Sequence, residues 1–262
     1  MYQTILYEEK ENIAYITFNR PEVGNAFSEV SFREIPEALT KASEDGNIRA
    51  VVLTGKGKLF CGGGDINQFK EMIEKDDGGI PEHLVEATGA MGRAIRNCSK
   101  PVIASINGAA AGAGMGVALA ADFRIMEKRS SLVTAFVGMG LPGDTGVLYF
   151  LQKMVGISMA TELLMFSKPI KGERAFELGL ANKVVEDGTL EEETWAFAKK
   201  VASLPTQTVS YQKQLSNEFF YSDLEKFNYR EAQLMHLSSL TDDHKEAVMA
   251  FLEKRAPHFR GH

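Results

Sequence analysis

The pattern of apolar and polar positions separates a mixed first part of the chain from a helical last part. In the first part, Thr4–Glu9 and Ile13–Asn19 alternate loosely around a polar break, which predicts a β-hairpin. The apolar runs Ala50–Thr54 and Val102–Ile106 predict buried strands, because β-branched residues suit the interior of a sheet. A further short strand is predicted at Asn182–Val185.

Helical spacing of apolar residues recurs between and after these strands. The segments predicted as helices are Ser28–Glu44, Ile66–Lys75, Glu82–Asn97, Met115–Ala121, Ile157–Phe166, Gly172–Leu178 and Leu190–Ala202. In the first of them, Ser31 and Glu34 have the spacing of a capping box. The polar stretch Asp76–Pro81 is predicted to be a mobile loop.

From Leu190 onward the pattern predicts no strand. The expected helices are Val209–Phe220, Asp223–Ser238 and Asp242–Arg255, with N-caps offered by Thr208, Ser222 and Thr241. We therefore divide the chain into a core, residues 1–189, and a helical segment, residues 190–262. The aromatic and methionine residues of this segment suggest packing against another subunit.

Two nearly charge-free stretches lie at the centre of the chain. Pro101–Ala121 has no ionisable side chain, and Asp144 is the only formally charged residue of Ser130–Gln152. A lone carboxyl in apolar surroundings is a candidate acid or base, and burial without a nearby cation predicts a pKa above ~3.9. The alternative is an exposed loop residue that caps the next helix at Thr145.

Two glycine-rich turns precede predicted helices. One is Ala109–Gly114, and the other is Gly62–Gly64, which is followed by Asp65 and the helix from Ile66. Such a turn leaves unpaired backbone N–H groups at a helix N-terminus, where a ligand can approach closely. Close packing of a buried helix is the other use of small residues. Neither turn has the spacing of a P-loop or of a dinucleotide fingerprint.

Composition limits the function classes. The chain has 262 residues, of which 44% are hydrophobic and 24% charged, as in an ordinary globular enzyme. A net charge of −6 argues against nucleic-acid binding. No membrane span is expected, since Asn107 and several glycines interrupt the longest charge-free run. The first ten residues have no apolar core typical of a signal peptide, so a cytoplasmic protein is expected.

Residues that commonly bind metals do not cluster in the sequence. Cys61 and Cys98 lack metal-ligand spacing, and no pair of histidines forms a His-x-x-His motif. The histidines are His83, His236, His244, His258 and His262. We therefore expect no metal site. A Gly-x-Ser-x-Gly nucleophile motif is also absent from the sequence.

Three motifs together resemble the crotonase superfamily, which is the enoyl-CoA hydratase/isomerase family. They are Phe60–Ile66 (FCGGGDI), Ile103–Ala118 (IASINGAAAGAGMGVA) and Leu141–Gly146 (LPGDTG). The resemblance covers nearly the whole chain and is strongest to members that isomerise 1,2-epoxyphenylacetyl-CoA or enoyl-CoA. It implies an α/β fold: a crotonase-like spiral of ββα units with a C-terminal helical trimerisation segment.

The resemblance also implies roles for individual residues. The amides of Gly64 and Ala113 would bind the thioester oxygen and stabilise an enolate, with Asp144 as the acid/base. The positions implied to contact the acyl-CoA substrate are Gly62, Gly63, Asp65, Ile66, Phe136, Phe251 and Lys254. Phe251 and Lys254 would reach a neighbour's site in a homotrimer or a dimer of trimers. No cofactor is implied, because coenzyme A is part of the substrate.

Departures from the family pattern bear on the reaction. Gly116 and Phe136 stand where typical hydratases have two glutamates, and Gly89 stands where a related dehalogenase has a histidine. One carboxyl suffices to move a proton from C2 to C4, whereas adding water is harder to arrange with one group. We therefore expect an enoyl-CoA isomerase. A hydratase and a non-catalytic acyl-CoA-binding scaffold remain the alternatives.

Overall fold

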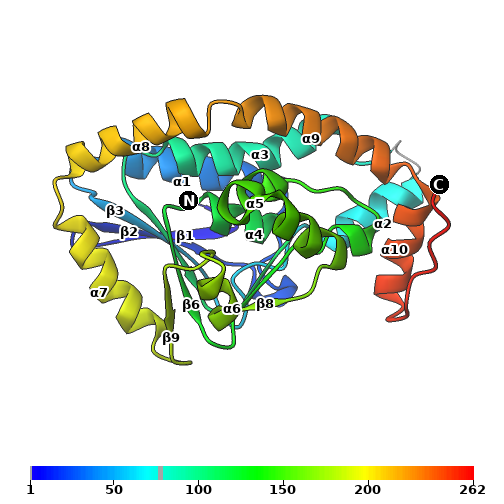
Figure 1. Cartoon of the computed structure of the whole chain (residues 1–262), viewed down its shortest axis with the longest axis horizontal. Helices are drawn as coiled ribbons and strands as arrows, with labels where there is room; N and C mark the ends of the chain where they lie inside the picture. The colour runs from blue at the N-terminus through cyan, green and yellow to red at the C-terminus, as the bar shows by residue number, and fades with distance from the viewer. Residues whose placement is uncertain (1, 76–78) are drawn as a thin grey trace.

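A six-stranded sheet forms the centre of the molecule (Figure 1), which we describe from a computed structural model covering residues 2–75 and 79–262. The strands lie in the order β1-β2-β3-β4-β6-β9; β1 and β2 form an antiparallel hairpin, and the other neighbours are parallel. Their bounds are Ile5–Lys10, Ile13–Phe18, Ala50–Gly55, Val102–Ile106, Phe123–Glu127 and Lys183–Val185. The predicted hairpin and buried strands are confirmed.

A second, three-stranded sheet lies beside the first. It consists of β5 (Ala109–Ala111), β7 (Ser131–Val133) and β8 (Ile170–Lys171). The sequence analysis did not predict these strands, nor β6. The three alanines of β5 include no β-branched residue, and β7 and β8, with three and two residues, are too short to show a pattern. Their pairing comes from segments distant in sequence.

Helices cover both faces of the larger sheet, so its inner strands are apolar on both sides. On one face, α1 (Glu29–Glu44) and α3 (Glu82–Asn97) pack against Val51, Leu53 and Ala104. On the other face, α7 (Leu190–Ala202) packs against a set of strand residues: Ile13, Ala50, Val52, Ile103 and Ile125. The helix that begins at the expected boundary near residue 190 therefore still belongs to the packing of the sheet.

The remaining helices follow the predicted spacing with shifted ends, except that α5 begins at Val147, so the first half of this helix was not predicted. They are α2 (Ile66–Lys75), α4 (Ala113–Ala120), α5 (Val147–Phe166), α6 (Gly172–Glu177), α8 (Thr206–Phe220), α9 (Leu224–Ser239) and α10 (Asp242–Leu252), with 3₁₀ turns η1 (Pro21–Val23) and η2 (Val137–Met139). In Figure 1, α8 and α9 run along the top above α1 and α3, and α10 descends beside α2. The predicted loop Asp76–Pro81 lies partly outside the described residues.

Three of the expected caps are wrong. Ser28, with Ser31 at the third helical position, forms the capping box of α1, while the carboxylate of Glu34 accepts hydrogen bonds from the backbone of Gln3 (2.7 Å) and Thr4 (2.8 Å). The N-cap positions of α8 and α9 are Pro205 and Asp223 rather than Thr208 and Ser222. In the first case the Glu34 carboxylate accepts from the backbone just before β1 instead, which local spacing cannot reveal. The cap at Thr241 is confirmed, since its hydroxyl accepts from the His244 amide (3.2 Å).

One described helix, α5, is long and apolar enough to cross a membrane by length and composition alone. A third of its most apolar window is buried inside the protein, and its backbone is non-helical at Gly156 (φ 76°, ψ 163°). Each of the two helical pieces is shorter than the ~20 residues that a span requires. The structure therefore gives α5 the form of a kinked, partly buried helix.

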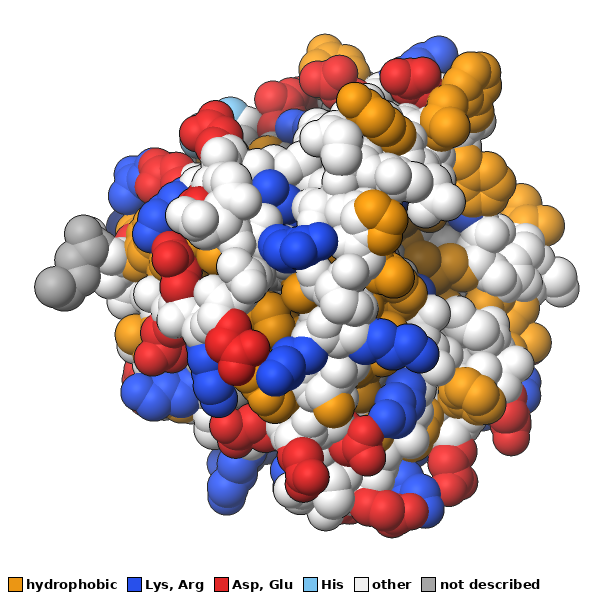
Figure 2. Space-filling model, turned by 90° about the vertical axis from the view of Figure 1, so that its left-hand side faces the viewer, with side chains coloured by type: hydrophobic (Ala, Val, Ile, Leu, Met, Phe, Trp, Pro, Cys, Tyr) orange, Lys and Arg blue, Asp and Glu red, His pale blue; other side chains and the backbone are white. Residues whose placement is uncertain are grey.

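The surface around α7 has no single dominant charge. On the face seen in Figure 2, acidic and basic side chains are interspersed, and hydrophobic side chains gather along the right-hand edge.

Large apolar side chains are strongly exposed on α5 and α8, among them Ile157 (70%), Phe166 (68%) and Phe219 (81%). Exposed apolar area of this kind is typical of surfaces that other subunits cover.

Candidate active site

The two glycine-rich turns pack directly against each other. Gly63 (φ +105°) and Gly112 (φ +51°) both adopt conformations that favour glycine. A Cβ added to Gly63 would lie 3.2 Å from the Ala111 carbonyl oxygen, and one on Gly112 would lie 3.7 Å from the Gly63 Cα. Hydrogen bonds between Cys61 and the β5 backbone hold the turns together (3.1 and 2.9 Å). Backbone from two distant segments therefore forms one wall.

Two amides on this wall are available to a ligand. Among the described residues, neither the N–H of Gly64 nor that of Ala113 has a hydrogen-bond acceptor. Ala113 is the first residue of α4, where an N–H has no partner within the helix. A pair of such donors, with the partial positive charge of a helix N-terminus, suits a carbonyl oxygen that gains negative charge.

A cavity of about 310 Å³ opens next to these amides. Its lining includes most of the residues expected at the site: Gly62, Gly63, Gly64, Ile66, Ala113, Phe136, Asp144 and Phe251. Apolar side chains from the remaining lining, such as Phe69, Leu141 and Met235, make it suitable for an acyl group. A much smaller cavity continues past Asp144 toward Leu84 and Val85.

Three of the expected contact residues differ in how they lie relative to the larger cavity of this chain. Asp65 borders only the smaller cavity, where its carboxylate forms an ion pair with Arg20 (3.0 Å). Phe251 lines the cavity of its own chain, and its contact with a neighbour's site stays a prediction. Lys254 follows the end of α10, is exposed, and is absent from the cavity lining of the described residues. A single chain therefore closes part of the cavity with its own last helix.

Asp144 lies in the turn between η2 and α5 and is almost completely buried. Its Oδ1 accepts a hydrogen bond from the Thr145 hydroxyl (2.8 Å). Burial raises its pKa to about 6, although the Thr145 bond acts in the opposite direction. The expected upward shift is confirmed. The capping alternative is wrong, because Gly146 is the N-cap of α5 and no side chain caps that helix.

Glu231 is a second buried carboxyl that the sequence analysis missed. It projects from α9, and its Oε2 accepts hydrogen bonds from the Gly146 amide (2.9 Å) and from Nδ2 of Asn228 (3.2 Å). Burial, followed by the negative charge of Asp144, raises its pKa to about 8. Nothing in the surrounding sequence distinguishes it from Glu225, the exposed glutamate of the same helix, so no sequence signal was available.

The positions that differ from the family pattern are filled by neighbouring groups. A Cβ on Gly116 would lie 2.7 Å from the Thr145 Cβ, and one on Gly89 would lie 2.9 Å from the Asn228 Cγ. Both distances are too short for a side chain without movement of the surroundings. Phe136 presents an apolar ring to the cavity. Asp144 is thus the only carboxyl on the lining of the larger cavity among the described residues.

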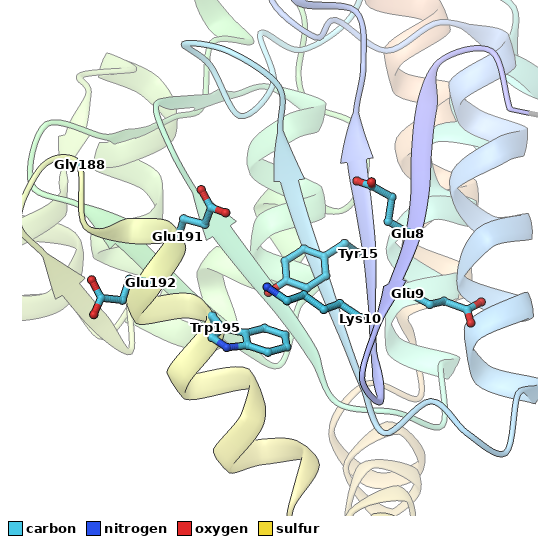
Figure 3. A pocket seen from close by; sticks show the side chains of 8 residues that line it. All are labelled: Glu8, Glu9, Lys10, Tyr15, Gly188, Glu191, Glu192 and Trp195. Carbon is cyan, nitrogen blue, oxygen red and sulfur yellow. The ribbon is translucent and has the colours of Figure 1, made fainter.

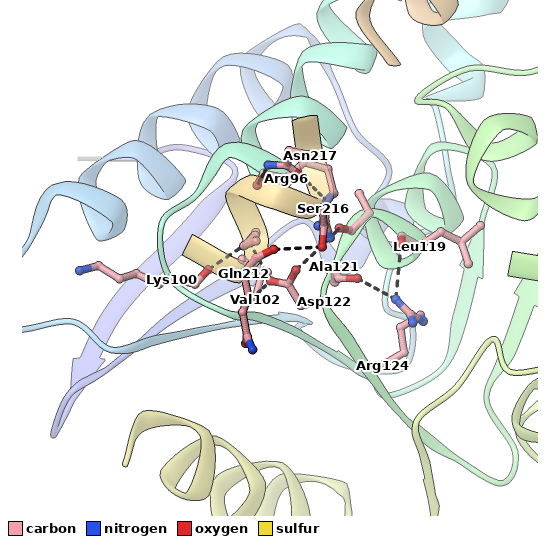
Figure 4. A network of polar contacts seen from close by, with 12 residues as sticks. Arg96, Lys100, Val102, Leu119, Ala121, Asp122, Arg124, Gln212, Ser216 and Asn217 are labelled. Carbon is pink, nitrogen blue, oxygen red and sulfur yellow. Dashed lines mark hydrogen bonds and ion pairs between the residues drawn. The ribbon is translucent and has the colours of Figure 1, made fainter. Parts of the chain in front are cut away.

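The far end of α4 is anchored by buried cations (Figure 4). The Arg124 guanidinium donates to the carbonyls of Ala121 (2.7 Å) and Leu119 (3.5 Å), as Figure 4 shows. Arg96 donates to the Ala120 carbonyl (3.3 Å). Arg96 and Lys213 also pair with Asp122 (2.9 and 2.7 Å). Carbonyls at a helix C-terminus favour positive charge, so this network fixes the helix that presents the Ala113 amide.

Another hollow, of about 680 Å³, lies between the β-hairpin and α7 (Figure 3). The Lys10 ammonium stands over the Trp195 ring (4.2 Å to its centre), and Glu8, Glu191 and Glu192 surround them. It is open to solvent and contains neither glycine turn. Among the described residues, no group of three histidine, cysteine, aspartate or glutamate side chains could hold a metal ion. This hollow therefore lacks the two amides and the buried carboxyl that meet at the cavity beside Asp144.

Comparisons with known proteins agree with this geometry. The chain is 32% identical over 260 residues to the trans-2-decenoyl-[acyl-carrier-protein] isomerase of Streptococcus mutans, covering 99% of both chains. It is 36% identical over 260 residues to a probable enoyl-CoA hydratase of Rhodobacter capsulatus, again covering 99% of each. It is 31% identical over 261 residues to the 1,2-epoxyphenylacetyl-CoA isomerase of Escherichia coli, covering 100% of both.

The fold is also found in solved structures. An enoyl-CoA hydratase from Mycobacterium avium subsp. paratuberculosis superposes with a TM-score of 0.90 at 23% identity, covering 99% of this chain and 100% of the other. The model of the enoyl-CoA hydratase/isomerase family matches residues 8–262. The chain therefore belongs to the enoyl-CoA hydratase/isomerase family, the crotonase superfamily.

Proposed function

We propose that this enzyme is an acyl-thioester isomerase that shifts a double bond through an enolate. The observation that carries the proposal is the presence of two free amides and one ionisable carboxyl, Asp144, on a single apolar cavity. The substrates are a 3-enoyl-CoA converted to a 2-enoyl-CoA, or the ring-epoxide 1,2-epoxyphenylacetyl-CoA. Coenzyme A is part of the substrate, and no cofactor is required.

Each step needs only groups of this site. The ionised Asp144 carboxylate removes a proton from C2, and the electrons of the C–H bond move into the thioester. The amides of Gly64 and Ala113 stabilise the resulting enolate oxygen. Asp144, now protonated, returns the proton to C4 as the double bond moves to C2–C3. A pKa near 6 suits both roles at neutral pH, because the group is ionised but remains a competent acid.

Hydration is the weaker alternative. A hydratase must activate a water and deliver a proton, and the residues that would do so in typical members are replaced by Gly116 and Phe136. The packing of Gly116 against Thr145 also leaves no room for a side chain there. A non-catalytic scaffold is disfavoured because a buried carboxyl with a raised pKa beside free amides is costly to maintain without a chemical use.

The thioester carrier is left open by the relatives, since one is named for an acyl-carrier-protein substrate and another for a coenzyme A substrate. We propose coenzyme A as the carrier. We also propose that the chain assembles as a trimer or a dimer of trimers, because large apolar side chains such as Phe219 (81%) are strongly exposed.

The test is incubation of the purified enzyme with 3-enoyl-CoA, 2-enoyl-CoA, epoxyphenylacetyl-CoA and 3-decenoyl-acyl-carrier protein. Mass spectrometry separates isomerisation, which leaves the mass unchanged, from hydration, which adds one water. Ultraviolet absorption reports conjugation of the double bond with the thioester. We expect isomerisation of a CoA substrate without hydration. Hydration as the faster reaction, or turnover of the carrier-protein thioester alone, contradicts the proposal.

A further inference from the structure

The carboxyl of Glu231 packs against the turn that carries Asp144, and the mechanism above does not use it. Its Oε2 accepts from the Gly146 amide (2.9 Å) and from Asn228 (3.2 Å), so two donors occupy this oxygen. A Cβ on Gly143 would lie 3.7 Å from its Oε1. Oε1 of Glu231 therefore faces Gly143, the residue before Asp144. Oε2 accepts a hydrogen bond from the amide of Gly146, two residues after Asp144.

The Oε1 of Glu231 is buried and has no hydrogen-bond partner among the described residues. A buried carboxylate oxygen without a donor is strongly unfavourable, whereas a neutral carboxylic acid avoids burying the charge. Since Oε2 accepts two hydrogen bonds, Oε1 is the oxygen on which a proton is best placed. The geometry thus favours a protonated Glu231 whose hydroxyl is on Oε1, the oxygen that faces Gly143.

The charged groups around Glu231 support this assignment. Among the described residues it takes part in no ion pair, and the negative charge of Asp144 acts with burial to raise its pKa. Arg93, from the adjoining α3, donates to Oδ1 of Asn228 (3.0 Å). His244, from α10, is bound through Nδ1 to the Met139 carbonyl (2.8 Å), and His236 to the Ile80 carbonyl (3.0 Å).

We propose that Glu231 is a positioning residue that stays neutral while Asp144 is ionised, and that ionisation of Glu231 sets the alkaline limit of the isomerisation. The inference rests on the proposed function for its link to rate. An ionised Glu231 would add a second negative charge behind the turn that carries Asp144, and that charge would oppose the negative charge that must develop on the enolate. The neutral acid leaves that charge unopposed and keeps the turn in place through the Gly146 amide.

The direct test measures the two carboxyl groups without any substrate. Protein labelled with ¹³C at the Asp and Glu carboxyl carbons is titrated by NMR, with Glu231→Gln and Asp144→Asn used to assign the signals. We expect Glu231 to remain protonated at pH 7 in the wild type, and its midpoint to fall by about one pH unit in Asp144→Asn, as for coupled groups. A Glu231 signal already ionised at pH 7, or unmoved by Asp144→Asn, overturns the inference.

The second test is the pH profile of kcat/KM for isomerisation. Glu231→Gln retains an acceptor for the Gly146 amide and cannot ionise, so we expect a rate at pH 7 within about threefold of wild type and no fall above pH 8. Glu225→Gln, at an exposed position of the same helix, is the control and should keep the wild-type profile. An unchanged alkaline fall in Glu231→Gln, or a tenfold loss at pH 7, contradicts the role. If no thioester is isomerised, the proposed function fails. The NMR titration still shows whether Glu231 is protonated at pH 7 and whether its ionisation depends on Asp144.

Discussion

Gly116 and Thr145 are in such close contact that a Cβ on Gly116 would lie 2.7 Å from the Cβ of Thr145. Thr145 is the neighbour of Asp144 and donates its hydroxyl hydrogen to the Asp144 carboxylate. Position 116 therefore lacks the glutamate of typical hydratases and also lacks the space for any side chain. The space that such a residue needs is occupied by the residue that holds the acid/base in place.

The first prediction follows from this contact. Gly116→Ala should destabilise the protein by about 1–3 kcal/mol through overpacking, and should reduce isomerisation further by displacing the turn at Asp144. Thermal unfolding and kcat measure the two effects. Gly46→Ala is the matched control, because a Cβ at exposed Gly46 has no neighbour within 4 Å. A Gly116→Ala enzyme with wild-type stability and activity would show that the contact is unimportant.

Asp144→Asn should abolish the chemistry and leave binding intact. The amide retains an oxygen that can accept the Thr145 hydroxyl bond, but it cannot remove a proton. We expect isomerisation to fall by a factor on the order of 10² or more, with acyl-CoA affinity measured by calorimetry within a fewfold of wild type. An Asn variant that retains most of its isomerase activity removes Asp144 from the mechanism.

The same substitution predicts a pH-dependent gain in stability. The folded-state pKa of Asp144 is about 6, above the ordinary 3.8, so the folded protein holds this proton more tightly than the unfolded chain. Stability from this group is therefore full below pH 3.8 and is lost as pH rises toward 6. Asp144→Asn should melt several degrees higher than wild type at pH 8, with a much smaller difference at pH 4. If the melting temperatures of the two proteins differ equally at pH 4 and pH 8, the raised pKa of Asp144 is contradicted.

Hydration of 2-enoyl-CoA should be slow compared with isomerisation. Only Asp144 offers a carboxyl to the larger cavity among its described lining residues, and Phe136 occupies the wall where a second one would stand. Gly116→Glu is not expected to create a hydratase, since its side chain meets Thr145. Product masses at early times measure both rates. A wild-type hydration rate equal to or above the isomerisation rate would reverse the assignment.

The exposed apolar residues predict assembly. Sedimentation at micromolar concentration should give a trimer or a dimer of trimers. Phe219→Asp should weaken this assembly, because it places a charge on the exposed apolar surface of α8. Glu225→Gln, an exposed polar change on the next helix, serves as the control. A stable wild-type monomer at that concentration is the contrary result.

Local sequence was sufficient where chemistry and backbone share one segment. The glycines of Gly62–Gly64 and Ala109–Gly114 mark turns that only small residues permit, and Asp144 stands alone in an apolar stretch. The helical and buried-strand patterns likewise gave most elements of the fold. These features are readable because each depends on residues that are adjacent in the chain.

Tertiary contacts determined what the sequence could not reveal. Glu231 is separated from Asp144 by 87 positions (231 − 144) and looks like any glutamate of a polar helix. Its burial depends on how α9 lies against α3 and the Gly146 turn. The strand β5 consists of three alanines and is held by pairing with β7 on one side and with Cys61 on the other. The own-chain position of Phe251 follows from the path of α10, which no local pattern specifies.

The two ends of helix α4 have different electrostatic surroundings. Its first amide faces the cavity, and its last carbonyls are neutralised by Arg96 and Arg124, which are both buried. The helix can therefore donate toward an anion without leaving its negative end exposed to the apolar interior. In the proposed mechanism, stabilisation of the enolate would consequently depend on the Ala113 amide and also on two cations at the opposite end of the helix.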